Sequence, residues 1–254
     1  MPTFPSLARG LVVAALAASS IPAVATTVAL PSADRTALEA LLGKDVIGDP
    51  VEPMPLSAED IPLKEGSWTY KIVGGKGKGN TQEDALSELK RDESGASWKY
   101  ATGAKDLAFI QRSDDHNIAV LSEQDADQGV ITRFSPAEPI LAVGMKAGDK
   151  KSIEIAVKVY DLSSPKEVSH TGSLKLEYSY VGAYKVTVPA GTYDAALLKW
   201  VYDGSVGPAS VQDTQYRFVA KDVGIVASID KKKISALLLY HDNTNVGKVL
   251  VKGP

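Results

Sequence analysis

The sequence contains no cysteine and only three histidines, and these two shortages exclude several classes of protein. Without cysteine there can be no disulfide, so core burial and strand pairing must supply the stability. A lipid anchor on an N-terminal cysteine is excluded for the same reason. The histidines, His116, His170 and His241, form no HxH or HExxH spacing, so the sequence predicts no metal site built on them.

A long uninterrupted apolar run is also missing. A membrane-spanning helix needs about 20 consecutive apolar residues, but the run from Leu11 to Ala18 is followed at once by serines and a proline. Arg9 precedes this run and the small residues Ala23–Ala25 follow it, which is the pattern of a secretory signal. We therefore predict a signal peptide over residues 1–25 and a periplasmic or secreted protein that does not span the membrane after cleavage.

Neither sign of charge dominates the chain. It has 28 basic and 31 acidic residues and a net charge of −3, and loss of residues 1–25 removes Arg9 and no acid, giving −4. The basic residues are dispersed among acidic ones and form no extended stripe. Because nucleic-acid binding depends on such a stripe, we expect no nucleic-acid partner.

Residues 26–62 predict a short helix and a proline-rich tether. The segment Pro31–Gly43 has Ser32 as a plausible N-cap and Gly43 just past its end. Its alanines and leucines form one apolar stripe, and a helix this short must dock that stripe on another surface to persist. Four prolines between Asp49 and Pro62 disfavour helices and central strands, so this part predicts an extended tether.

Residues 63–254 predict a single antiparallel β-domain. In Lys151–Tyr160 isoleucine and valine alternate with charged residues, and Ser173–Tyr180 repeats the alternation. The stretch Asn80–Glu93 fits a helix or a polar strand equally well. Turn signals about 8 to 12 residues apart favour a meander that forms a barrel or half-barrel. The other predicted strands are Trp68–Val73, Ala96–Ala101, Leu107–Arg112, Ile118–Ser122, Val130–Phe134, Gln215–Ala220, Ile225–Ile229 and Ile234–His241.

A tight turn interrupts strand-forming residues in VTVPAGTYDAALLKW, residues 186–200. Pro189 has no N–H to donate to a ladder and Gly191 can adopt positive φ, so both are predicted structural turn residues. Gly224 has the same predicted role between two later strands. The strand that leaves the first turn, Tyr193–Tyr202, is apolar on both faces, which predicts that a second layer or the N-terminal helix covers it.

These C-terminal residues resemble a family of bacterial envelope proteins of unknown function. The shared features are a VPAGT[YF] turn at Val188–Tyr193, an aromatic strand at Tyr216–Phe218, a VG[IL]V step at Val223–Val226 and a closing strand ending at Tyr240. The resemblance covers about the last third of the chain. It implies an exported antiparallel β-protein, akin to the half-barrels of the LolA and LolB lipoprotein carriers, and it implies no catalytic residue.

Two stretches look like ligand motifs but lack the required order. GGKGKGN at 74–80 has no Ser or Thr after its lysine, so a hairpin loop explains it better than a phosphate loop. EQDADQG at 123–129 lacks the later ligands of a calcium loop and predicts an acidic turn. His116 and His241 have acidic neighbours but lie at predicted strand ends. The sequence predicts no catalytic residue, no metal and no cofactor.

The aromatic residues on predicted strands are the remaining functional signal. A filled core and an apolar cavity within a curved sheet are both compatible with them. The first hypothesis is a non-enzymatic protein that binds a hydrophobic small molecule, a lipid or an envelope component. An envelope interaction or assembly module that uses a sheet edge is the alternative, and an uncharacterised hydrolase-like enzyme is third. The candidate ligand-binding residues are Trp68, Tyr70, Trp98, Phe109, Phe134, Trp200 and Phe218.

Overall fold

The computed structural model describes residues 26–90, 95–236 and 240–254, without the side chains of 235–242. The predicted signal peptide therefore lies outside the described residues. In the described part of the chain, no helix is long and apolar enough to cross a membrane. The elements are α1 (Ser32–Leu42), β1 (Ile47–Val51), the 3-10 helix η1 (Ala58–Asp60), β2 (Gly66–Gly75), β3 (Thr81–Glu88), β4 (Trp98–Thr102), β5 (Asp106–Arg112), β6 (Ile118–Asp125), β7 (Val130–Leu141), β8 (Lys150–Asp161), β9 (Val168–Val188), β10 (Gly191–Val206), β11 (Ala209–Ala220), β12 (Gly224–Ala236) and β13 (Tyr240–Lys252).

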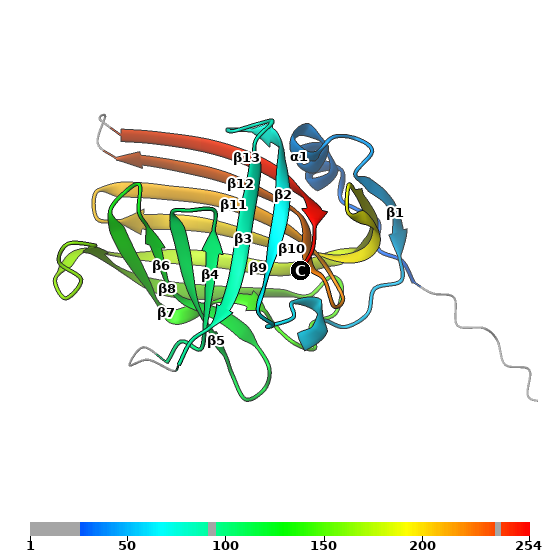
Figure 1. The fold of residues 1–254 in the computed structure, drawn as a ribbon. Coiled ribbons are helices and arrows are strands. Elements are labelled where there is room, and N and C mark those ends of the chain that lie inside the picture. Colours follow the sequence, from blue (N-terminus) through cyan, green and yellow to red (C-terminus); the bar gives the residue numbers. More distant parts are fainter. Residues whose placement is uncertain (1–25, 91–94, 237–239) are drawn as a thin grey trace, which may run out of the picture.

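Twelve strands, β2 to β13, form a closed antiparallel barrel (Figure 1). Each strand pairs with the next one along the chain, and β13 returns to pair with β2, with Val246 opposite Gly75. The predicted antiparallel meander with a short N-terminal helix is confirmed, and the barrel is closed. Barrels of about eight strands are just filled by their own side chains, so a ring of twelve has room for an internal cavity.

Strand β9 has two partners in succession on the same edge. Its first half pairs with β8, as far as Ser179 opposite Lys150, and its second half pairs with β1, where Tyr184 lies opposite Pro50. A proline is tolerated there because β1 is an edge strand and needs no N–H from that residue. The predicted proline-rich tether is therefore extended here as an edge strand of the sheet, and it departs from extended structure in the 3-10 helix η1.

The rest of that proline-rich stretch crosses one end of the barrel. We call residues 54–63 the strap, and the end that it crosses the strap end. The Leu56 N–H donates to the Met145 carbonyl at 2.8 Å, and the Tyr180 hydroxyl donates to the Met54 carbonyl at 3.0 Å. The Asp222 N–H donates to the Glu59 carbonyl at 2.8 Å. These bonds join the strap to β9 and to two of the loops at that end, so the strap is a docked part of the fold.

Helix α1 lies on the outer surface of the barrel, next to β13 and β2 (Figure 1). Its Leu38 side chain is fully buried, and Asp34 accepts bonds at 2.7 Å from both Lys199 Nζ and the Tyr216 hydroxyl. The predicted docking of the amphipathic stripe is confirmed. The contact is close because Gly74 on β2 lies opposite Gly247 on β13, which leaves the helix backbone a surface without side chains.

Replacing Gly74 with alanine is expected to destabilise the protein by displacing α1. A Cβ at this position would lie 2.1 Å from the Leu41 carbonyl oxygen, so the helix must move away from the barrel. Overpacking of this kind costs about 1–3 kcal/mol. Urea unfolding followed by circular dichroism measures the loss. Gly253→Ala is the matched control because a Cβ there meets nothing within 4 Å, and equal stability of the two variants would contradict the tight contact.

Most predicted strands are present, with three differences. The ambiguous stretch at 80–93 forms β3 from Thr81 to Glu88. The single strand predicted over 234–241 is wrong, because β12 ends at Ala236 and β13 begins at Tyr240, so the chain reverses within that range. β13 itself extends to Lys252. Pro189 and Ala190 form the predicted tight turn, with Val188 opposite Gly191.

Candidate functional site

A cavity of about 190 Å³ lies inside the barrel. Side chains reach it by strand alternation: on β11, Gln215 and Arg217 face the cavity while Tyr216 and Phe218 face the outer surface that carries α1. Nine of the twelve barrel strands and the strap contribute to its wall. The lining residues are Ile61, Pro62, Leu63, Trp68, Tyr70, Leu86, Tyr100, Thr102, Ala108, Ile110, Ile118, Val120, Glu123, Glu138, Pro139, Ile140, Trp200, Gln215, Arg217, Gly224 and Ile225.

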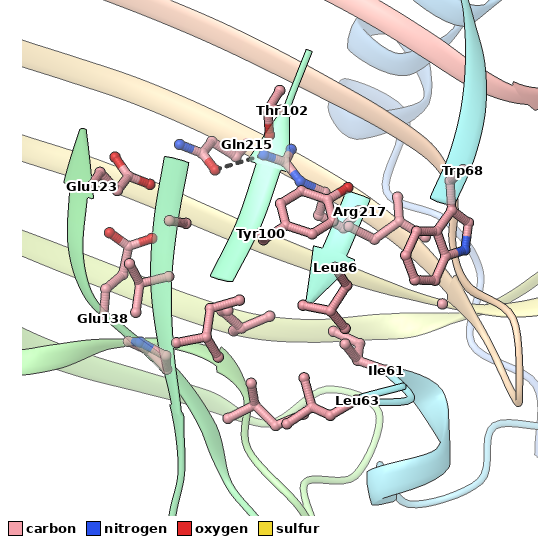
Figure 2. A pocket seen from close by; sticks show the side chains of 18 of the residues that line it. Ile61, Leu63, Trp68, Leu86, Tyr100, Thr102, Glu123, Glu138, Gln215 and Arg217 are labelled. Atoms are coloured by element: carbon pink, nitrogen blue, oxygen red, sulfur yellow. Dashed lines mark hydrogen bonds between the residues drawn. The ribbon is translucent and has the colours of Figure 1, made fainter. Parts of the chain in front are cut away.

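The wall is apolar toward the strap end. Ile61 and Leu63 of the strap lie below Leu86, and Trp68 flanks them (Figure 2). The polar atoms of the aromatic residues here are already bonded to backbone. The Trp68 indole N–H donates to the Val223 carbonyl at 3.0 Å, and the Tyr70 hydroxyl donates to the Ile225 carbonyl at 2.9 Å. A ligand at this end therefore meets hydrocarbon and ring faces.

Trp200 extends the apolar wall on the β10 side. Its indole N–H donates to the Pro139 carbonyl at 2.7 Å, and its ring lies 5.1 Å from that of Tyr178. The ring is thereby held in one orientation beside the cavity. The Arg217 guanidinium lies 6.0 Å from the centroid of the Trp200 ring. Trp200 therefore lies where the apolar wall meets a polar region.

Two carboxyl groups, from Glu123 on β6 and Glu138 on β7, lie on one side of the polar region (Figure 2). The Tyr202 hydroxyl donates to Glu138 Oε1 at 2.7 Å. Solvent reaches Glu123, which is exposed, whereas Ile118 nearer the strap is only 1% exposed. The cavity thus opens at its acidic side and is closed at its apolar side.

Burial within the barrel wall raises the pKa of both carboxyls. Burial and, to a smaller extent, the neighbouring Glu123 carboxyl raise the pKa of Glu138 to about 8, although the hydrogen bond from Tyr202 acts in the opposite direction. Burial also raises the pKa of Glu123, while the positive charge of Lys232 acts in the opposite direction. A bound group that supplies positive charge or donates hydrogen bonds would stabilise the ionised forms of these two carboxyls.

Arg217, across the cavity from these acids, is already occupied. One terminal nitrogen donates to the Asp230 carboxylate at 2.6 Å and to Gln215 Oε1 at 3.0 Å. The other donates to the carbonyls of Tyr216 and Ile229 at 3.1 and 3.0 Å. Its charge is therefore matched by Asp230, and the terminal donors of its fork are used within the protein.

A second buried ion pair, formed by Lys248 and Asp84, lies close to Tyr70. Lys248 Nζ is 2.8 Å from Asp84 Oδ2 and 4.7 Å from the centre of the Tyr70 ring. The Tyr100 hydroxyl donates to the same carboxylate oxygen at 2.8 Å, and Gln82 donates to the other at 2.7 Å. This cation, like Arg217, is matched by a carboxylate of its own.

The structure brings three of the seven candidate aromatic residues together at the cavity, Trp68, Tyr70 and Trp200. Trp98 and Phe134 pack against the core without lining the cavity. Phe109 is likewise absent from the lining, and it alternates with the cavity residues Ala108 and Ile110. Phe218 packs edge-on against Tyr184 at 6.5 Å, on the face opposite to Arg217.

Sequence reasoning missed the polar half of the site. One available signal was Arg217, a charged residue inside the apolar run YRFVA, where burial requires a partner. The sequence predicts an acidic turn that includes Glu123, but Glu123 lies on β6 opposite Ala108 and Thr132. Glu138 lies beyond the predicted strand Val130–Phe134. It lies in β7, opposite Val120 of β6.

The other motifs fall outside the cavity wall. GGKGKGN forms the β2–β3 hairpin loop as predicted, with the Lys78 N–H bonded to the Gly75 carbonyl. In the predicted acidic turn the Gln128 N–H donates to Asp125. His116 lies in the loop before β6, 3.0 Å from Arg112, and the side chain of His241 lies outside the described residues. Among the described residues, three or more potential metal ligands nowhere gather into a site.

No protein-family model matches the sequence, and no curated protein matches it at a significant level. Among solved structures, a candidate lipoprotein from Parabacteroides distasonis is similar at 15% identity and a TM-score of 0.39, over 79% of this chain and 99% of that one. A candidate exported protein with a YmcC-like fold from Bacteroides fragilis gives 13% and 0.42, over 79% and 100%. The hypothetical lipoprotein YmcC from Escherichia coli gives 9% and 0.39, over 89% and 100%. Likenesses this distant carry no conclusion about ligand or activity.

Proposed function

We propose that this protein is a non-enzymatic, exported binding protein that holds a small hydrophobic or amphipathic molecule inside its barrel. The observation that carries the proposal is the cavity, which has an apolar closed end and a polar end that solvent reaches. Small-molecule sites are generally concave and mainly apolar, with a few polar groups that orient the ligand. The exported location rests on the predicted signal peptide at 1–25.

The volume limits the apolar part of the ligand. An engineered protein cavity of about 150 Å³ lined by aliphatic and aromatic side chains binds benzene, so a space of about 190 Å³ accommodates one ring or a short chain. A hexyl chain is a suitable probe. At about 0.8 kcal/mol for each buried CH₂ group, its burial supplies about 4–5 kcal/mol, which corresponds to a Kd from about 1 mM to several-fold lower.

The envelope interaction module has less support from the fold. That hypothesis uses a sheet edge and the proline-rich tether. Closure of the ring pairs both edges of every barrel strand, and the outer edge of β1 is the one left unpaired among the described strands. The strap is bonded to the barrel.

Binding of hexan-1-ol to the purified protein tests the proposed function. Two of the three tryptophans, Trp68 and Trp200, line the cavity, so binding is expected to change the intrinsic fluorescence with a Kd near 1 mM or below. Ala108→Phe, which fills the cavity from β5, is expected to weaken binding at least tenfold. Ala85→Phe on the exposed face of β3 is the control and keeps the wild-type affinity. Absence of binding by hexan-1-ol, hexylamine and hexanoate alike would overturn the proposed function.

A further inference from the structure

We propose that the cavity selects ligands that carry a protonated amine next to a short apolar group, in preference to fatty acids and other carboxylates. This inference rests on the proposed function and specifies the chemistry of the ligand's polar group. It follows from how the charges inside the barrel are matched.

Two cations beside the cavity, Arg217 and Lys248, are already paired and are not available to an anionic ligand. Arg217 is matched by Asp230 at 2.6 Å, and Lys248 by Asp84 at 2.8 Å. The two terminal nitrogens of Arg217 each make two bonds within the protein. A ligand carboxylate would have to displace Asp230 or Asp84 from these partners and leave another buried carboxylate unpaired, which is costly.

The carboxyls of the polar region are not matched in this way. Glu123 and Glu138 both line the cavity, and neither forms an ion pair with any residue that the structure describes. Tyr202 donates to one oxygen of Glu138 only. Nearby on β11, Asp213 has one buried oxygen, Oδ1, without a hydrogen-bond partner. Lys232 on β12 acts on Glu123 and Asp213 through space.

The positions of these groups fit a ligand with its charge at one end. The apolar wall formed by Ile61, Leu63 and Trp68 closes the cavity at the strap end, and the glutamates lie toward the solvent-reached end (Figure 2). A short apolar group at the strap end places an attached ammonium near Glu123 and Glu138. An ammonium has three donors and one positive charge, which are the features that this pair of carboxyls lacks.

A matched ligand series tests the inference. Hexylamine, hexan-1-ol and hexanoate share one chain length, so differences in affinity report on the polar group. At pH 8.5, above the Glu138 pKa of about 8, hexylamine is expected to bind wild-type protein at least tenfold more tightly than hexanoate, with hexan-1-ol between them. Calorimetry and tryptophan fluorescence measure the three affinities.

Variants separate the charge effect from the apolar effect. Glu123→Gln with Glu138→Gln is expected to weaken hexylamine binding about tenfold and to leave hexan-1-ol within twofold of wild type. Glu83→Gln, on the exposed face of β3, is the control and should change neither. Equal affinities for hexylamine and hexan-1-ol, or tightest binding of hexanoate, would overturn the amine preference while the proposed function stands. If none of the three ligands binds, the proposed function itself fails.

Discussion

Replacing Asp84 with alanine is expected to lower the free energy of unfolding by about 3–5 kcal/mol. Asp84 is fully buried on β3 and neutralises Lys248, whose ammonium is 2.8 Å away and nearly buried. It also accepts hydrogen bonds from Tyr100 and Gln82. Without the carboxylate, a charged lysine and two polar side chains lose their partner inside the barrel. Urea unfolding monitored by fluorescence and circular dichroism measures the loss.

A double-mutant cycle shows whether the unpaired charge causes this loss. Lys248→Met combined with Asp84→Ala removes both charges, and the double variant is expected to be more stable than Asp84→Ala alone. Asp194→Ala, which breaks the exposed pair with Lys185 on the outer surface, is the control and should cost about 0–1 kcal/mol. If Asp84→Ala costs no more than Asp194→Ala, the buried pair is not a main source of stability.

Replacing Glu138 with glutamine is expected to stabilise the protein at high pH. The pKa of this carboxyl rises from its ordinary 4.5 to about 8, so between these values the folded protein keeps a proton that the unfolded chain has released. The free energy of unfolding of the wild type therefore falls as pH rises through this window. One pKa unit corresponds to about 1.4 kcal/mol. Because the cavity is partly solvated and Glu123 titrates together with Glu138, the full shift is not converted into stability. We therefore expect the variant's free energy of unfolding to exceed that of the wild type by about 2–3 kcal/mol at pH 9.

The same variant is expected to match the wild type at pH 4, where the carboxyl is protonated in both states. The glutamine amide still accepts the bond from Tyr202, so the comparison isolates the charge. The other groups that act on Glu138 are Glu123, Asp213 and Arg217, and all remain in the variant. Unfolding curves from pH 4 to pH 9 for wild type, Glu138→Gln and the exposed control Glu83→Gln give the result. Parallel pH profiles for all three would show that Glu138 is not desolvated.

The architecture was predictable where local patterns decide it. Alternation in Lys151–Tyr160 and Ser173–Tyr180 predicted β8 and β9, and the missing N–H of Pro189 predicted the turn after β9. The leucines of Ser32–Leu42 predicted a docked helix, and the structure has one. Each of these features depends on residues that are close together in the sequence, so a single pass along the chain finds them.

The charged groups inside the barrel depend on strand pairings that no local pattern encodes. Asp84 and Lys248 are 164 positions apart and become neighbours only when β13 pairs with β2. Closure also decides the environments of the adjacent residues Phe218 and Arg217: Phe218 packs against Tyr184 on the outer face, and Arg217 faces the cavity. The sequence alone does not show which face of a strand points into the barrel, so an aromatic residue on a strand can face either the cavity or the outside. The seven aromatic candidates therefore divided between cavity, core and outer surface.

The pairing of β13 with β2 also determines when the molecule can first hold a ligand. β2 begins at Gly66, and β13 spans Tyr240–Lys252, so the two strands that close the ring are far apart in the sequence. Contacts between such distant segments form late in folding, because the entropy cost of closing a long loop precedes the favourable energy of the contacts. Until β13 has paired with β2, the cavity has one wall missing. An enclosed binding space of the proposed kind therefore exists only in the fully folded barrel, and a partly folded chain lacks it.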